Sequence, residues 1–360
     1  MSTNNTPLTR VAVIGYGGMG RWHTIKVAGI ENMEVAGVYD IDPERMELAR
    51  QAGLHTYESP EALLADPTVD VVTVATPNHL HRPLCIQAMQ AGKNVVCEKP
   101  VALSSSELQD MIDTAKACGV LFTVHQNRRW DEDFLIVKKL MADNTIGPIY
   151  RIESRVHGSR GIPGDWRCRK AYGGGMVMDW GVHLLDQALQ LTDSPIKSVY
   201  AQLSYITGSE CDDGFTVQLC FENGLELEVQ VGTNNYITQP RWYVLGQNGS
   251  AQITSFRKND GIIVTVTNRD NRDAVPVETA AGLTKTMAPR TSDTIQEYPL
   301  PTVQSDIHDY YYNMANVIRG TEEPIVNHAS VRRVFRLMEA IIESHETGKV
   351  VTGFDIPPAK

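Results

Sequence analysis

The feature that most constrains this chain is a glycine-rich segment, residues 15–20, which directly follows an apolar run near the start. It reads Gly-Tyr-Gly-Gly-Met-Gly and opens a stretch with a helical pattern. In a strand–turn–helix unit of this kind, Gly15 permits the tight turn, Gly17 lets the backbone approach a pyrophosphate, and Gly20 lets the helix pack closely on the strand. Asp40 lies 20 residues after Gly20, at the end of the next apolar run, where a carboxylate accepts hydrogen bonds from a ribose. The pattern predicts a dinucleotide-binding site formed by Gly15, Tyr16, Gly17, Gly18, Met19, Gly20 and Asp40.

Asp40 also bears on which dinucleotide binds. A carboxylate at this position repels the 2′-phosphate of NADP, and the sequence shows no arginine directly beside it. Arg45 is the nearest basic residue and leaves some NADP binding open. We therefore predict NAD(H) as the cofactor, with NADP as the weaker alternative.

The first third of the chain alternates short β-branched runs with helical stretches such as Pro83–Ala91 and Ser104–Cys118. This alternation is typical of parallel βαβ units with helices on both faces of the sheet. It predicts an α/β, doubly wound Rossmann domain over residues 1–127. Six strands are expected: Val11–Gly15, Val35–Asp40, a weak one at His55–Tyr57, Val69–Thr76, Asn94–Glu98 and Val120–Gln126.

The pattern changes after residue 127 and predicts a second, α+β domain over residues 128–360. We expect a helix at Asp131–Ala142, a strand at Ile149–His157 and a helix at about Gly175–Leu191. From Lys197 onward the alternation of apolar and polar residues indicates antiparallel sheet, with a type I′ hairpin turn at Asn223-Gly224. The polar segment 268–305 has no assignable fold. Two closing helices are predicted within residues 306–347.

The charge balance limits the class of partner. The 360 residues contain 43 acidic and 33 basic side chains, a net charge of −10, which disfavours nucleic acid and anionic membranes. No apolar run approaches the ~18 residues of a membrane span, and the first ten residues are too polar for a signal sequence. Six cysteines include no CxxC pair. We expect a cytoplasmic protein that acts on a small molecule and holds no metal.

Polar clusters follow the fourth and fifth predicted strands, at Thr76-Pro77-Asn78-His79-Leu80-His81 and at Glu98-Lys99-Pro100. In an open α/β sheet the ligand lies beyond the carboxyl ends of the strands, so these clusters should face the cofactor. The proline after Lys99 allows a cis peptide bond. His79 and His81 have no third ligand at a usable spacing, which favours capping or cofactor packing over a metal role. The cofactor is therefore expected to contact Thr76, Pro77, Asn78, His79, His81, Glu98 and Lys99.

Asp179 and His183 are four residues apart in the predicted helix at Gly175–Leu191. Four residues make one α-helical turn, so the two side chains share a face. A carboxylate placed there orients an imidazole and stabilises its charged form, as a general base requires. The alternative is an Asp/His pair on the surface of an amphipathic helix.

Several motifs, in this order along nearly the whole chain, resemble the Gfo/Idh/MocA family, named for glucose-fructose oxidoreductase and inositol dehydrogenase. They are the glycine loop at 15–20, Thr76-Pro77-Asn78-His79, the run Ala91-Gly92-Lys93-Asn94-Val95 leading to Glu98-Lys99-Pro100, Asn127-Arg128-Arg129-Trp130, and Asp179 with His183. The resemblance implies a second domain with a large open, mostly antiparallel sheet whose outer face commonly makes oligomer contacts. A homo-oligomer is therefore expected.

The resemblance also implies the catalytic residues, which by motif position are Lys99, Asp179 and His183. His183 would remove the proton of a secondary hydroxyl, Lys99 would bind the same oxygen, and the carbinol hydride would move to the nicotinamide. Asp179 would hold the pair in place. Further cofactor contacts are expected from Asn127, Arg128, Trp166 and Arg167.

The segment Gln126–Asp131 and the three glycines at 173–175 look most like those of inositol and cyclic-sugar dehydrogenases. This likeness suggests a polyhydroxylated ring, oxidised at a secondary hydroxyl to a ketone, with the 3-hydroxyl of a glucoside as the preferred substrate. The alternatives are the reverse reduction of a keto-sugar or keto-inositol, a sugar-acid dehydrogenase, and a non-enzymatic dinucleotide-binding regulator.

A basic island lies between Arg151 and Lys170 in this acidic chain. It indicates contacts with the cofactor's pyrophosphate or with another subunit, or else an acidic substrate. Several aromatic residues, including Trp180 and Trp242, could stack on a sugar ring, although most such residues are core. The predicted substrate-binding residues are Lys99, Arg128, Arg155, Trp166, Tyr172, Asp179, His183 and Tyr236.

Overall fold

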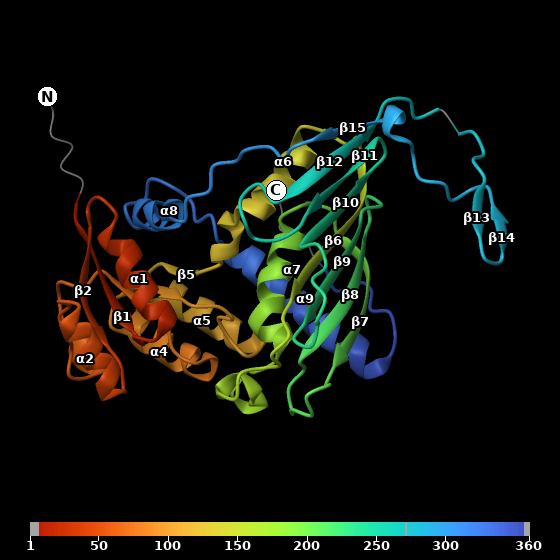
Figure 1. The fold of residues 1–360 in the computed structure, drawn as a ribbon. Coiled ribbons are helices and arrows are strands. Elements are labelled where there is room, and N and C mark those ends of the chain that lie inside the picture. Colours follow the sequence, from red (N-terminus) through yellow and green to blue (C-terminus); the bar gives the residue numbers. More distant parts are fainter. Residues whose placement is uncertain (1–6, 271, 356–360) are drawn as a thin grey trace, which may run out of the picture.

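The computed structural model describes residues 7–270 and 272–355. The outermost residues of the two predicted domains, 1–6 and 356–360, and residue 271 of the unassigned segment lie outside the described residues. Two sheets make up the fold, a parallel one formed by the first part of the chain and a larger one formed by the later part (Figure 1).

The first sheet is parallel and confirms the predicted doubly wound α/β class. Its strands run in the order β2-β1-β3-β4-β5. The predicted strand at His55–Tyr57 is reduced to a single bridge between Thr56 and Val38. The bounds are β1 Thr9–Ile14, β2 Met33–Tyr39, β3 Val71–Val74, β4 Asn94–Cys97 and β5 Phe122–Val124.

The helices of this half begin and end at the residues that their sequences favour. The Ser104 hydroxyl accepts the Glu107 amide at the start of α5, and Gly119 ends that helix in the left-handed conformation. Asp42 caps α2 in the same way, with Pro43 at its first position. The bounds are α1 Gly18–Ala28, α2 Pro43–Gln51, α3 Pro60–Ala65, α4 His81–Gln90 and α5 Ser105–Cys118.

The second sheet has eight strands in the order β15-β12-β11-β10-β6-β9-β8-β7, and it is antiparallel except for the β6–β9 pair. Alternate residues of its strands are buried, and α6 Glu132–Ala142, α7 Val182–Leu189 and α9 His328–Thr347 contribute to the same core. The other face carries polar side chains. The bounds are β6 Ile149–His157, β7 Ile196–Ser204, β8 Gly214–Phe221, β9 Glu226–Gly232, β10 Trp242–Gly246, β11 Gly249–Ile253, β12 Gly261–Val266 and β15 Ile295–Tyr298.

The predicted hairpin at Asn223-Gly224 joins β8 and β9, but its turn is not type I′. A type I′ turn needs positive φ at both central residues, and only Gly224 has it, at +85°. The Asn223 side chain instead accepts the Leu225 amide, which stabilises a wider turn.

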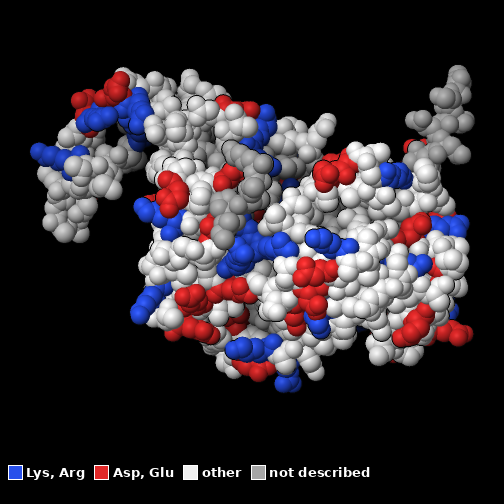
Figure 2. Space-filling model, turned by 180° about the vertical axis from the view of Figure 1, so that it is seen from behind, with Lys and Arg blue, Asp and Glu red and all other residues white. Residues whose placement is uncertain are grey.

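Most of the unassigned segment 268–305 forms an arm. It leaves the sheet after β12, makes a small hairpin from β13 Val277–Thr279 and β14 Gly282–Thr284, and returns as β15 at the sheet edge. The arm stands off the body at the right of Figure 1 and at the upper left of Figure 2, where basic and acidic side chains are interspersed on the visible face.

Helix α8, His308–Ile318, belongs by sequence to the second predicted domain, residues 128–360, but it packs on the first sheet. Its residues Tyr310, Tyr311 and Met314 are buried in the core of the parallel sheet. The hydrophobic cores therefore do not divide where the sequence pattern changes, and the domain boundary stays a prediction. Within residues 7–270 and 272–355, no helix is long and apolar enough to cross a membrane.

Candidate functional site

A cavity of about 320 Å³ lies at the carboxyl ends of β1, β3 and β4. This is the edge of a parallel sheet where ligands bind in open α/β folds. It brings together the glycine loop, the two polar clusters and the loop around Trp166, as the sequence predicts. Its lining residues are Gly17, Gly18, Met19, Arg45, Ala75, Thr76, Pro77, Asn78, Glu98, Lys99, Asp165, Trp166, Arg167 and Asp179.

The glycine loop has the tight geometry that a dinucleotide turn requires. Gly15 has φ +96°, and a Cβ there would lie 2.4 Å from the Ala75 carbonyl oxygen. A Cβ on Gly20 would lie 1.8 Å from the Gly15 carbonyl oxygen, so only glycine lets α1 pack this closely on β1. Tyr16 is buried, and its backbone N–H points away from the cavity to Asp40.

Asp40 is buried behind this loop, where its Oδ2 accepts the Tyr16 amide at 2.6 Å and its Oδ1 accepts the Asp42 amide at 2.9 Å. The expectation that no arginine lies beside it is wrong. The first turn of α2 brings the Arg45 guanidinium to 3.4 Å from Asp40 Oδ2, at the wall of the cavity. The site therefore has both the carboxylate that favours NAD and a partly exposed cation.

Asn78 and His79 connect the end of β3 to the segment before the predicted catalytic helix. The Asn78 amide donates to the Gly173 carbonyl at 2.8 Å, and His79 stacks on Tyr172 with ring centroids 4.3 Å apart. Tyr172 therefore packs against the loop that follows β3. It was predicted to bind the substrate, but it does not line the second cavity described below.

His81 was expected to contact the cofactor, but it is fully buried outside the cavity. Its two ring nitrogens lie 2.8 Å from the carbonyl oxygens of Thr76 and Pro100. Burial lowers the pKa of His81. Helix α4 begins at His81, and the imidazole points inward between the loops that follow β3 and β4. The contacts of His81 with both carbonyl oxygens therefore hold these two loops together.

Lys99 and Asp179 form the centre of the site. The Lys99 Nζ lies 3.1 Å from Asp179 Oδ1 and 3.0 Å from the Asp179 carbonyl oxygen, and the Lys99–Pro100 bond is cis, as the sequence allows. Arg167 Nε lies 3.8 Å from Asp179 Oδ2. Two of the three ammonium protons of Lys99 are therefore directed to Asp179, and one is left for a substrate oxygen.

The predicted pairing of Asp179 with His183 is replaced by the pairing of Asp179 with Lys99. Residues Val177–Gly181 form a π-helical turn, and the α-helix α7 begins only at Val182. No hydrogen bond or ion pair between Asp179 and His183 is found among the described residues, whereas Asp179 accepts from Lys99.

His183 is buried, and its Nδ1 has no hydrogen-bond partner among the described residues. Burial, together with the charges of Lys99 and Arg128, holds the pKa of His183 well below its usual range. The imidazole is therefore neutral at pH 7 and able to accept a proton. The expectation that Asp179 stabilises its charged form is not met.

A stack of cations and aromatic rings, which the sequence did not reveal, lies beside His183, whose ring centroid is 6.0 Å from that of Trp180. The Arg128 guanidinium lies 4.3 Å from the Trp180 ring centroid and 5.3 Å from that of Phe256. Arg241 lies 5.2 Å from the same Phe256 ring. These residues come from distant segments, so no local pattern could have joined them. Asn127 lies on the turn with Arg128 but lines neither cavity.

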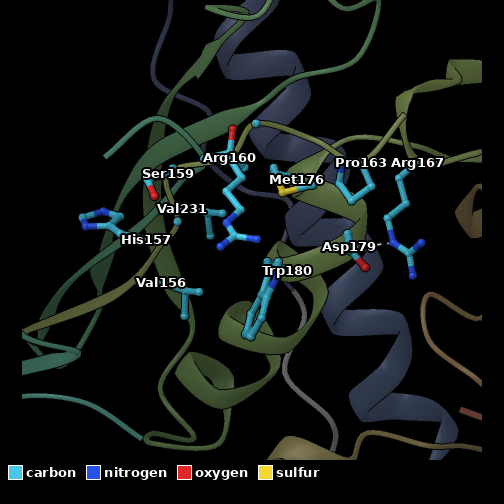
Figure 3. A pocket seen from close by; sticks show the side chains of 14 residues that line it. Val156, His157, Ser159, Arg160, Pro163, Arg167, Met176, Asp179, Trp180 and Val231 are labelled. Carbon is cyan, nitrogen blue, oxygen red and sulfur yellow. Dashed lines mark ion pairs between the residues drawn. The ribbon is translucent and has the colours of Figure 1, made fainter. Parts of the chain in front are cut away.

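A second cavity of about 440 Å³ adjoins the first and shares Arg167 and Asp179 with it (Figure 3). Arg160 and Trp180 extend into it, and apolar side chains from β6, β9 and the π turn complete its wall. Trp166 lines only the first cavity. Its lining residues are Val156, His157, Gly158, Ser159, Arg160, Gly161, Pro163, Arg167, Met176, Asp179, Trp180, Val231, Gly232 and Thr233.

Four other residues predicted to bind substrate line neither cavity, namely Arg155, Tyr236, Arg128 and His183, and Lys99 lines only the first. Arg155 points to the outer face of the sheet, where it contacts Glu153 and Gln230. Tyr236 is 82% exposed on a loop. The alternation along β6 explains the position of Arg155. Ile152 and Ser154 face the core, so the residues next to them in the strand, including Arg155, face outward.

The strand ends contain buried polar atoms that fit a bound dinucleotide and a polar substrate. Thr76 Oγ1, the Gln126 amide, Arg128 Nε and His183 Nδ1 have no hydrogen-bond partner among the described residues. Buried polar atoms are normally paired, so a bound molecule or water is expected to satisfy them. Of these residues, Thr76 lines the first cavity, and with the glycine cradle it makes that cavity a suitable dinucleotide site.

Comparisons with known proteins agree with this geometry. A family model described as "Oxidoreductase family, NAD-binding Rossmann fold" matches residues 9–126, and the GFO/IDH/MocA C-terminal domain matches residues 134–252. A solved NAD-binding protein from Listeria innocua is 47% identical with a TM-score of 0.91, over 96% of this chain and 100% of that one.

Several curated relatives are dehydrogenases by name. The scyllo-inositol 2-dehydrogenase (NADP(+)) of Bacillus subtilis is 27% identical over 95% of each chain. The D-glucoside 3-dehydrogenase of Escherichia coli is 31% identical over 55% of this chain and 58% of its own length. Curated relatives at 31–34% identity are matched over only 55–62% of their length.

Proposed function

Because the chain belongs to the Gfo/Idh/MocA oxidoreductase family, we propose that it is an NAD(H)-dependent dehydrogenase that oxidises a secondary ring hydroxyl of a sugar, glycoside or inositol to a ketone. One observation carries the proposal: Asp179, which forms an ion pair with Lys99 of the dinucleotide cavity, lines both that cavity and the second one. A substrate in the second cavity would therefore meet both the catalytic side chains and the cofactor.

The catalytic roles follow from the charge states of the side chains. Neutral His183 accepts the hydroxyl proton, and the free N–H of Lys99 binds the same oxygen as its negative charge develops. Asp179 holds the Lys99 ammonium in position through two contacts. When bound, the nicotinamide supplies the hydride acceptor.

The preferred substrate is a glucoside oxidised at its 3-hydroxyl, and an inositol is the alternative. The aromatic face of Trp180 in the second cavity suits a sugar ring, and two of the dehydrogenase relatives act on these two substrate classes by name. The proposal includes both directions of the reaction: oxidation of the hydroxyl and reduction of the corresponding ketone.

A sugar acid is a second candidate, favoured by one observation. Arg160 extends into the second cavity, and no ion pair or hydrogen bond of its guanidinium is found among the described residues. A substrate carboxylate would pair with it.

The test is NADH formation, followed by fluorescence, across inositols, glucose, glucosides and sugar acids. Lys99→Ala and His183→Ala should each lower turnover at least ~10²–10⁴-fold and leave NAD affinity nearly unchanged. Near-normal turnover in either purified variant would refute the assigned roles. Absence of turnover on every polyol, with a co-purifying protein partner, would favour the regulator instead.

A further inference from the structure

Glu98, at the end of β4, is buried between two histidines that no catalytic role uses. Its Oε1 lies 2.9 Å from His23 Nε2 and 2.8 Å from His125 Nδ1, and its Oε2 accepts the Lys99 amide at 3.1 Å. Both imidazoles are fully buried and Glu98 is 5% exposed. The carboxylate thus accepts three N–H groups.

The contacts of the two histidines direct one ring nitrogen of each toward Glu98. The Tyr311 hydroxyl lies 2.8 Å from His23 Nδ1, so it donates there while Nε2 donates to Glu98. Burial lowers the pKa of His23. His125 Nε2 is buried without a partner, so a proton on it would leave an N–H with no acceptor.

Glu98 is therefore a buried carboxylate whose side-chain partners are two imidazoles, and in the described part of the chain no lysine or arginine side chain is bonded to it. Burial opposes its ionisation, but the contacts of His125 and His23 more than offset this and hold the pKa of Glu98 well below its usual range. The neighbouring cation, Lys99, directs its ammonium to Asp179 instead. A buried negative charge of this kind is stabilised most by a positive charge placed beside it.

The cavity that Glu98 lines is the place for such a charge. The nicotinamide ring is positively charged in NAD⁺ and neutral in NADH, and no other part of the two molecules differs in charge. We propose that Glu98, supported by His23, His125 and Tyr311, is the residue that makes the site prefer the oxidised dinucleotide over the reduced one. This inference rests on the proposed dinucleotide function.

A divalent metal is the competing occupant of the cluster. The ligand atoms of His23, Glu98 and His125 lie within 4.8 Å of one another, and zinc accepts this donor set. We favour the hydrogen-bonded anion, because each histidine N–H facing Glu98 is at an ordinary hydrogen-bond distance and the hydroxyl of Tyr311 completes the network.

The experiment measures the dissociation constants of NAD⁺, NADH and ADP-ribose for the purified, nucleotide-free protein and its Glu98→Gln variant by calorimetry. Gln keeps the shape of the side chain and removes the charge. We expect the ratio of the NADH to the NAD⁺ dissociation constant to fall about tenfold in the variant, with ADP-ribose affinity unchanged. Glu107→Gln is the matched control, since that carboxylate also accepts a backbone amide but lies outside the cavity.

An unchanged ratio, or equal weakening of all three ligands, overturns the inference, as does stoichiometric zinc in the wild-type protein. If Glu98→Gln does not fold, the wild type alone decides: NAD⁺ must bind more tightly than NADH, and the opposite order overturns the inference. Failure of ADP-ribose and both dinucleotides to bind the wild type would instead refute the proposed function.

Discussion

Asp40 is the residue on which we expect the choice of dinucleotide to depend. Its carboxylate repels a 2′-phosphate, whereas Arg45, 3.4 Å away, attracts one. Asp40→Ala should therefore raise NADP affinity about tenfold relative to NAD, because Arg45 is then free to pair with the phosphate. Titrations with both dinucleotides measure the change. Asp42→Ala, which removes the more exposed partner of Arg45, is the control. An unchanged preference in Asp40→Ala would refute this role.

Arg241 is a buried cation that we expect to matter for stability. Its guanidinium contacts Asp133 at 3.1 Å, Ser154 at 2.6 Å and Gln187 at 2.7 Å, and burial lowers its pKa to about 10, so it stays charged at pH 7. Arg241→Met leaves the buried Asp133 without its cation and should lower the free energy of unfolding by about 3–5 kcal/mol. Urea denaturation measures this, with exposed Arg257→Met as the control. A loss below ~1 kcal/mol would show that Asp133 is satisfied without it.

His183 sets the expected pH dependence of turnover. Its pKa is lowered by burial, then by Lys99 and Arg128, so the neutral, proton-accepting form persists below pH 6.5 and is lost only as the pH falls through the lowered value. The acidic limb of kcat/KM against pH should lie below 6.5. Arg128→Gln removes one of the positive charges and should move this limb upward. A limb above 6.5 in the wild type would exclude His183 as the base.

At the scale of elements, the π turn Val177–Gly181 is the feature that brings Asp179 to Lys99. Deleting Met178 lets the chain continue as an ordinary α-helix into α7, whose residues stay anchored in the core. Asp179 then moves around the helix axis, and kcat should fall at least ~10²-fold while dinucleotide affinity is kept. Circular dichroism checks the fold, and Asp179→Asn serves as the comparison that keeps the position. A deletion variant as active as the parent would contradict this role of the turn.

The sequence predicted those elements whose signals are local. The glycine loop, most of the two strand-end clusters and β6 were placed correctly because each depends on a strand and the residues right after it, whereas His81 lies outside the cavity. The pairing of Asp179 with Lys99 could not be predicted locally, because the two residues are 80 positions apart in the sequence. The sequence analysis named Arg45 but missed its contact with Asp40, and it missed the Arg128–Trp180–Phe256 stack, because these contacts form only in the folded chain. The arm could not be assigned because it is largely exposed and has no periodic apolar face.

At the scale of the whole molecule, we propose that the outer face of the eight-stranded sheet joins copies of the chain. Helices cover only the other face, and central outward residues such as Tyr243 and Glu153 are only partly exposed. Light scattering after gel filtration should give a mass above that of one chain. Tyr243→Lys should lower this mass and leave the monomer folded, because Glu153 lies opposite and accepts the charge. Tyr236→Lys, on an exposed loop, is the control. A monomeric wild type would refute the proposal.

The packing of α8 against the parallel sheet has a consequence for synthesis on the ribosome. The dinucleotide-binding half is made first, but Tyr310, Tyr311 and Met314, which complete its core, are made near the end. Its apolar surface therefore stays uncovered until most of the chain has emerged, whereas many proteins fold their first domain while the rest is being translated. We therefore expect a product truncated before residue 310 to expose this apolar surface and to aggregate more readily than the full chain.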